Sequence, residues 1–164
     1  MELLGVQLEM PSEAPMMLLR EAGGERRVLP VYIDTPEARS IHLGLDKVKV
    51  ARPLTHDLLK LVLDDLGATV VSVTVTELRE RTFYAELVLD VAGERHVISC
   101  RPSDGVAIAV RTDTPIYAAE AVLDEAGQII VDDSNISEED SEELLDEFKR
   151  FIEDVTPEDF GEQA

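Results

Sequence analysis

Two short segments contain residues whose types and spacing suit them to binding an anion. They run R-P-L-T-H-D at residues 52–57 and R-P-S-D at residues 101–104. Each stands where a helix is expected to begin, and a helix N-terminus presents free N–H groups and a positive dipole end to an anion. The guanidinium groups of Arg52 and Arg101 could each hold a phosphate or carboxylate through two hydrogen bonds. If the fold brings both segments together, one phosphodiester would be held from two sides.

Other residues of these segments could move protons or hold a metal ion. Histidine as a residue type titrates near neutral pH, so His56 could act as a general acid or base. Asp57 or Asp104 could orient His56 or bind a divalent cation such as Mg²⁺. The ligands of such a cation stay undetermined, because the sequence has no C-x-x-C, H-E-x-x-H or P-loop motif.

A purely structural interpretation of the same residues stays open. Thr55 and Ser103 have the residue types of helix N-caps, and an aspartate in the first helical turn is favoured by the helix dipole. The two arginines could then simply pair with the aspartates of their own segments. The anion site therefore depends on whether the two segments converge on one cleft.

The elements that must position these residues begin with strands. Residue patterns predict strands at 2–9, 16–20 and 27–33, the last two forming a hairpin around Gly23-Gly24. A helix begins at Thr35 as N-cap, with Pro36 in its first turn. A second helix follows, with Thr55 as its cap and an apolar stripe predicted to be buried. That stripe comprises Leu58, Leu59, Val62, Leu63 and Leu66.

The second half repeats this order. Strands are predicted at 69–78, 82–90 and 94–100, followed by a helix capped by Ser103, an extended piece at 115–117 and a helical turn at 120–126. The run G-E-R-R-V-L at 24–29 resembles G-E-R-H-V-I at 93–98. We therefore predict an α+β fold, with a mixed or antiparallel sheet built from two β-β-α units and packed helices. A chance likeness between two hairpin turns is the alternative.

Charge separates the chain into two parts. The formal net charge is −20, of which residues 132–164 carry −12 through 14 acidic and two basic residues. A capping-box pattern at 137–140 and apolar residues at helical spacing predict an acidic amphipathic helix there. We expect a folded domain over residues 1–131 and an acidic helical tail over 132–164. The helical apolar positions are Leu144, Leu145, Phe148, Phe151 and Ile152.

The expected compartment is the cytoplasm. Cys100 is the single cysteine, so no internal disulfide can form, which fits a reducing environment. No apolar run approaches the roughly 20 residues that a membrane-spanning helix needs. The alternation of apolar and polar residues at the start of the chain is unlike a secretory signal. We therefore expect no association with a membrane.

The ordered blocks resemble the bifunctional nuclease domain family. They are R-P-L-T-H-D-L at 52–58, T-F-Y-A-E-L at 82–87 and R-P-S-D-G-V-A-I-A at 101–109. The resemblance implies hydrolysis of phosphodiester bonds in RNA and DNA. Gly105 stands where the family usually has alanine, which weakens the start of that helix slightly. The resemblance implies catalytic roles for His56, Asp57 and Asp104, substrate binding by Arg52, Thr55, Arg101 and Ser103, and secondary roles for Glu37 and Arg111.

A non-catalytic module that binds an anion or a protein partner in a regulatory role is the alternative. Nucleic acids attract basic surfaces, and this chain is strongly acidic with few aromatic residues for base stacking. The expected partners are therefore RNA or DNA in the first case and a protein in the second. The apolar stripe of the tail could pack against its own domain, which is the default interpretation, or against a second copy, which would form a homodimer.

Overall fold

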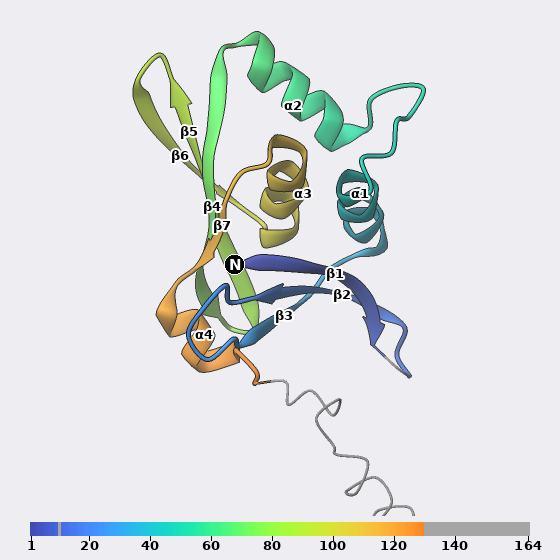
Figure 1. The fold of residues 1–164 in the computed structure, drawn as a ribbon, viewed down its shortest axis with the longest axis vertical. Helices are drawn as coiled ribbons and strands as arrows, with labels where there is room; N and C mark the ends of the chain where they lie inside the picture. Colours follow the sequence, from blue (N-terminus) through green and yellow to red (C-terminus); the bar gives the residue numbers. More distant parts are fainter. Residues whose placement is uncertain (10, 130–164) are drawn as a thin grey trace, which may run out of the picture. The chain divides into compact units, whose positions relative to one another are not determined.

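The described part of the chain is an α+β structure. A computed structural model describes residues 1–9 and 11–129, which lie in one compact unit, Met1–Ile130 (Figure 1). The predicted acidic helix lies outside the described residues. Within them, no helix is both long enough and apolar enough to cross a membrane. The order is β1 (Glu2–Glu9), β2 (Ala14–Arg20), β3 (Val28–Tyr32), α1 (Thr35–Leu45), α2 (Thr55–Asp65), β4 (Ala68–Arg79), β5 (Thr82–Val91), β6 (Glu94–Cys100), α3 (Pro102–Thr112), β7 (Ile116–Ala118) and α4 (Glu120–Ala126).

The strands form two sheets instead of one. Strands β1, β2 and β3 make an antiparallel sheet in that order. The other sheet has the order β6-β5-β4-β7, in which β7 runs parallel to β4 and the remaining pairs are antiparallel. One apolar core joins both sheets, because buried residues of β2, β3, β4, β5 and α3 belong to a single cluster.

The predicted pair of β-β-α units is present. Hairpin β2–β3 leads into α1, and hairpin β5–β6 leads, through Arg101, into α3 (Figure 1). The two copies differ in burial, because Val28 and Leu29 are 3% and 0% exposed while the matching Val97 and Ile98 are 60% and 46% exposed. Both β3 and β6 are edge strands, so the difference follows from packing: β3 contributes Leu29 and Val31 to the core cluster, whereas only Cys100 of β6 packs against that cluster.

Two details of the helices differ from the sequence prediction. First, each predicted hydroxyl cap lies one residue or more inside its helix, and no side-chain cap bond is made at these helix starts in the described structure. At α2 the start is stabilised instead from the third helical residue, because Asp57 Oδ2 accepts a hydrogen bond from the Leu54 N–H at 2.9 Å. The residues that precede the helices are Asp34, Leu54 and Arg101, in place of Thr35, Thr55 and Ser103.

Second, the apolar stripe predicted for α2 is mostly exposed. Leu63 is the one buried residue of α2, all of which is described. The helix contacts α3 and β4 on one narrow side, so its other apolar positions face outward. Exposed fractions range from 40% at Leu59 to 68% at Leu66, just beyond the helix, with Leu58 and Val62 between them.

Helix α3 lies at the centre of the packing, against α1, α2, β4 and β5. Gly105 in its first turn makes this position feasible. A Cβ atom added to Gly105 would lie 2.7 Å from Val73 Cγ1 and 3.3 Å from Cys100 Sγ. Val73 is fully buried in β4, so its side chain has little room to move aside. Glycine here allows the helix that carries Arg101 and Asp104 to approach the sheet closely.

We predict that Gly105→Ala lowers the free energy of unfolding. Overpacking a core costs roughly 1–3 kcal/mol, which exceeds the gain of at most about 1 kcal/mol from replacing a helical glycine. Urea unfolding followed by circular dichroism measures the difference. The matched control is the same change in a Val73→Ala background, where the added methyl group has space and the loss should shrink. A more stable single variant would contradict the steric argument.

Candidate functional site

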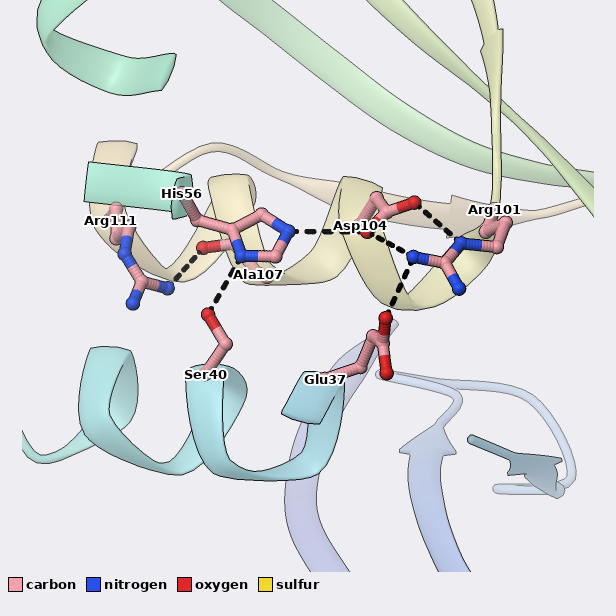
Figure 2. Close-up of polar contacts among 7 residues, drawn as sticks. All are labelled: Glu37, Ser40, His56, Arg101, Asp104, Ala107 and Arg111. Carbon is pink, nitrogen blue, oxygen red and sulfur yellow. Dashed lines mark hydrogen bonds and ion pairs between the residues drawn. The ribbon is translucent and has the colours of Figure 1, made fainter. Parts of the chain in front are cut away.

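Side chains from the N-terminal halves of α1, α2 and α3 meet at one place (Figure 2). Helix α1 supplies Glu37 and Ser40, which Figure 2 shows facing the other two helices. Helix α2 supplies His56, and the start of α3 supplies Arg101 and Asp104. Packing of α1 and α2 against α3 therefore brings together residues that lie far apart in the sequence.

His56 is held by hydrogen bonds at both ring nitrogens. Its Nδ1 lies 2.8 Å from Ser40 Oγ, and its Nε2 lies 3.2 Å from Asp104 Oδ1. Burial by itself would raise the pKa of Asp104, but the hydrogen bonds from Arg101 and His56 outweigh it and lower that pKa. Ionised Asp104 can only accept, so His56 Nε2 carries a proton. In neutral His56, Nδ1 is then the basic nitrogen and accepts from the Ser40 hydroxyl.

Arg101 contacts two carboxylates and still keeps a large exposed surface. Its Nε and Nη2 donate to Asp104 at 2.7 and 3.0 Å, and Nη2 also donates to Glu37 Oε1 at 2.8 Å. These bonds, that to Asp104 first, raise the pKa of Arg101, so its charge is permanent. Arg101 thus pairs with the aspartate of its own segment, as the structural interpretation expected. Its side chain is nevertheless 58% exposed and remains accessible to a ligand.

Asp57 has a different environment from Asp104. Its Oδ1 accepts a hydrogen bond from Arg111 Nε at 2.6 Å, and Arg111 Nη1 donates to the Ala107 carbonyl at 2.6 Å. The Arg111 side chain is only 7% exposed. With its other oxygen on the Leu54 N–H, Asp57 fastens the start of α2 to α3. It makes no hydrogen bond to His56 among the described residues, whose imidazole is oriented instead by Ser40 and Asp104.

We predict that Asp57 makes the stability of the fold depend on acid pH. The hydrogen bond from Arg111 lowers the pKa of Asp57 below its ordinary value of 3.8, so this carboxylate stabilises the fold above about pH 4. That contribution is lost as the pH falls below 3.8 through the folded-state pKa. Asp57→Asn should therefore be less stable than the unmodified chain at pH 7, with the difference narrowing in acid. Thermal unfolding between pH 7 and pH 3 tests this, and a constant difference would refute it.

The predicted site residues fall into three groups by location. Thr55, His56, Arg101 and Asp104 line one cleft of about 310 Å³. Ser103 lines a second cleft of about 530 Å³, which Arg101 also borders. Asp57 and Arg52 border neither cleft. Arg52 is exposed and makes no ion pair or side-chain hydrogen bond with residues 1–9 or 11–129. The two arginines are thus not brought to one cleft, and Arg101 alone occupies the predicted position.

Ser40 lines the first cleft beside Glu37 and Arg39, although the sequence patterns did not predict it as a site residue. A usable signal was present, because Ser40 lies three residues after Glu37 and therefore on the same helix face. Ser40 is 7% exposed, and its hydroxyl is hydrogen-bonded to the imidazole of His56. The burial of this polar pair indicates a specific contact between α1 and α2. Glu37 also stands out, since its Oε2 is buried and has no hydrogen-bond partner among the described residues.

The residues present do not form a ready metal site. Within residues 1–9 and 11–129, no three His, Cys, Asp or Glu side chains are grouped so that they could hold a metal ion. Asp57 and Asp104, the predicted ligands, each accept hydrogen bonds from an arginine. A cation would have to compete with a guanidinium at either carboxylate.

Comparison with known proteins identifies the family. Residues 17–131 match the bifunctional nuclease domain. An uncharacterized protein of Mycobacterium tuberculosis strain H37Rv is 42% identical over 160 residues, which cover 96% of this chain and 94% of that protein. Bifunctional nuclease 2 of Arabidopsis thaliana is 27% identical over 79% of this chain and 41% of its own length, and Bifunctional nuclease 2 of Oryza sativa subsp. japonica is 30% identical over 62% and 32%. The chain thus spans less than half of these plant proteins. The resemblance of its sequence blocks is confirmed, and the chain belongs to the bifunctional nuclease domain family.

Proposed function

We propose that the protein is a hydrolase that cleaves phosphodiester bonds in RNA and DNA. The observation that carries this proposal is the chain of hydrogen bonds from Ser40 through His56 to Asp104 at a cleft bordered by Arg101. The names of the plant relatives, which are bifunctional nucleases, support the same activity. An oriented imidazole beside a permanent positive charge provides what hydrolysis of a phosphodiester requires.

In the proposed reaction, Arg101 binds the non-bridging oxygens of the phosphodiester and stabilises the negative charge that grows on them. A water molecule attacks phosphorus and loses a proton to His56 Nδ1 through the Ser40 hydroxyl. The imidazolium that forms is stabilised by ionised Asp104 at Nε2. The bond from phosphorus to the leaving oxygen then breaks, and the imidazolium returns its proton to that oxygen. Asp104 acts as a positioning residue for His56, whereas Ser40 both orients the imidazole and relays the proton.

Incubation of the purified full chain with single-stranded RNA and single-stranded DNA tests the function. We expect both strands to be shortened, and gel electrophoresis of end-labelled strands follows the products. Parallel reactions with added Mg²⁺ and with a chelator determine whether a divalent cation contributes. Absence of cleavage under every condition, in protein whose circular dichroism shows the α+β fold, would remove the nuclease assignment.

A second candidate function is a non-catalytic module that binds a protein. The observation that favours it is the exposed apolar surface of α2, where Leu58 and Leu61 are 54% and 51% exposed. The partner that we propose for this surface is a second copy of the chain, because a two-fold contact would remove the same apolar face from water on both copies. A dimeric mass by light scattering together with no cleavage would favour this candidate. A monomeric mass would contradict the homodimer.

A further inference from the structure

A second cleft lies next to the one that contains His56. It has a volume of about 530 Å³ and lies between the end of β3, the turn from β4 to β5, and the start of α3. Arg101 borders both clefts, so they adjoin at its guanidinium. The polar and aromatic residues that line this second cleft are Tyr32, Asp34, Arg81, Phe83, Arg101 and Ser103.

Ser103 gives this cleft a hydrogen-bonding group that lacks a partner. The residue is 6% exposed, and its hydroxyl makes no hydrogen bond to any residue in the described part of the chain. Among residues 1–9 and 11–129 the one fully buried side-chain polar atom without a partner is Glu37 Oε2, so the Ser103 oxygen is open to the cleft and can bond to water or to a ligand there. The hydroxyl stands beside Arg101, so the two together could contact neighbouring oxygens of one ligand.

Arg81 gives the cleft a second positive charge. It occupies the turn between β4 and β5, where Glu80 and Arg81 have left-handed backbone angles with φ of 49° and 65°. A two-residue hairpin turn of this kind requires positive φ at both central residues, so these angles follow from the turn, which places Arg81 at its tip. Arg81 is exposed and forms no ion pair with residues 1–9 or 11–129. Unlike Arg101, it therefore offers a charge that no carboxylate of the described residues contacts, and Asp34 is the one acidic residue that lines the same cleft.

Two aromatic rings provide apolar contact surface in the same cleft. Tyr32 is 57% exposed, and its hydroxyl donates to Glu9 Oε1 at 2.5 Å, which fixes the direction of the ring. Phe83 is half-buried against the core. Exposed, anchored rings beside arginines are the combination that stacks unpaired bases and holds their phosphates in proteins that bind single strands.

We propose that this cleft, called the flanking groove, binds the nucleotides adjacent to the phosphodiester held at His56 in a single strand of RNA or DNA. This inference rests on the proposed function, because the His56 cleft supplies the position of the bond that is cleaved. Arg81 contacts a flanking phosphate, Ser103 adds a contact to the phosphodiester that Arg101 binds, and Tyr32 stacks on a base.

Binding of fluorescein-labelled strands, followed by fluorescence anisotropy, tests the groove. Full-length protein carrying His56→Ala serves as background, so that the strand stays intact. We expect Arg81→Ala to raise the Kd of an eight-nucleotide strand about tenfold. The slope of log Kd against log salt concentration should fall by about the amount that corresponds to one phosphate contact. Ser103→Ala should raise that Kd about fivefold. A dinucleotide, which contains a single phosphate, should show a smaller effect of Arg81→Ala.

The matched control is Arg95→Ala, which removes one exposed arginine at the opposite end of β5 from the groove. It should change Kd by less than about twofold. Equal binding by the Arg81→Ala and Arg95→Ala proteins would overturn the groove, as would stronger binding of duplex than of single strands. The proposed function is judged separately by cleavage with the unmodified chain. If the unmodified chain cleaves strands but the Arg81→Ala and Arg95→Ala proteins bind equally well, the groove alone is refuted. If Arg81→Ala weakens binding but the unmodified chain cleaves nothing, the nuclease function alone is refuted.

Discussion

Replacing His56 with alanine is expected to lower kcat for cleavage of RNA and DNA by about 100-fold or more. A positioned general acid or base typically contributes roughly 10²–10⁴-fold to a rate, and His56 is fixed at both nitrogens beside the cleft. Initial rates on end-labelled strands at saturating concentration give kcat. KM should change less, because the imidazole acts on the proton that moves and not on the bound strand.

His96→Ala is the matched control for this prediction. His96 lies on the exposed edge strand β6 and borders neither cleft. Its replacement should leave kcat within about twofold of the unmodified chain. Unfolding midpoints of both variants show whether any loss of rate comes from loss of fold. If the His56→Ala protein retained full kcat, His56 would have no catalytic role, and the hydrogen-bonded chain would be purely structural.

Replacing Arg101 with alanine is expected to lower kcat/KM about 100-fold, because removing one stabilising donor at a developing anion typically costs that much. Arg101→Lys should recover only part of the loss. A lysine carries the charge but cannot make the fork of bonds by which Arg101 spans Glu37 and Asp104. Steady-state rates for the three proteins on the same strand provide the comparison.

Arg79→Ala is a closely matched control for Arg101. Arg79 is 60% exposed and donates two hydrogen bonds to Glu77, so it resembles Arg101 in exposure and in carboxylate pairing. It borders neither cleft, and its replacement should leave kcat/KM within about twofold. Equal losses in the Arg79→Ala and Arg101→Ala proteins would show a general charge effect and contradict a specific role for Arg101.

Local sequence patterns predicted most strands and helices, because alternation, helical spacing and turn residues act over a few positions. The strand bounds of β1, β5 and β6 match within two residues. Burial of α2 could not be predicted in this way. An apolar face is visible in the sequence, but whether another element covers it depends on the packing of α2 against α3 and β4.

The candidate site was predictable only in part, because local patterns identify candidate residues but do not determine which elements pack together. The blocks around His56 and Arg101 identified three residues that meet, whereas Arg52 lies apart from the cleft. The contact of Ser40 with His56 of α2 depends on how closely α1 and α2 each approach α3. Gly44 allows that approach, since a Cβ atom there would lie 2.6 Å from Val110 Cγ2. Such a steric fit between helices has no counterpart in local sequence patterns.

The two carboxylates around Arg101 bear on how the products leave. An internal phosphodiester carries one negative charge, whereas the end group created by hydrolysis carries nearly two at neutral pH. Glu37 and Asp104 both contact the guanidinium, so the dianion would lie next to two like charges. That repulsion disfavours retention of the cleaved end and favours turnover over product inhibition. Intact linkages should therefore compete well against terminal phosphates for the same cleft.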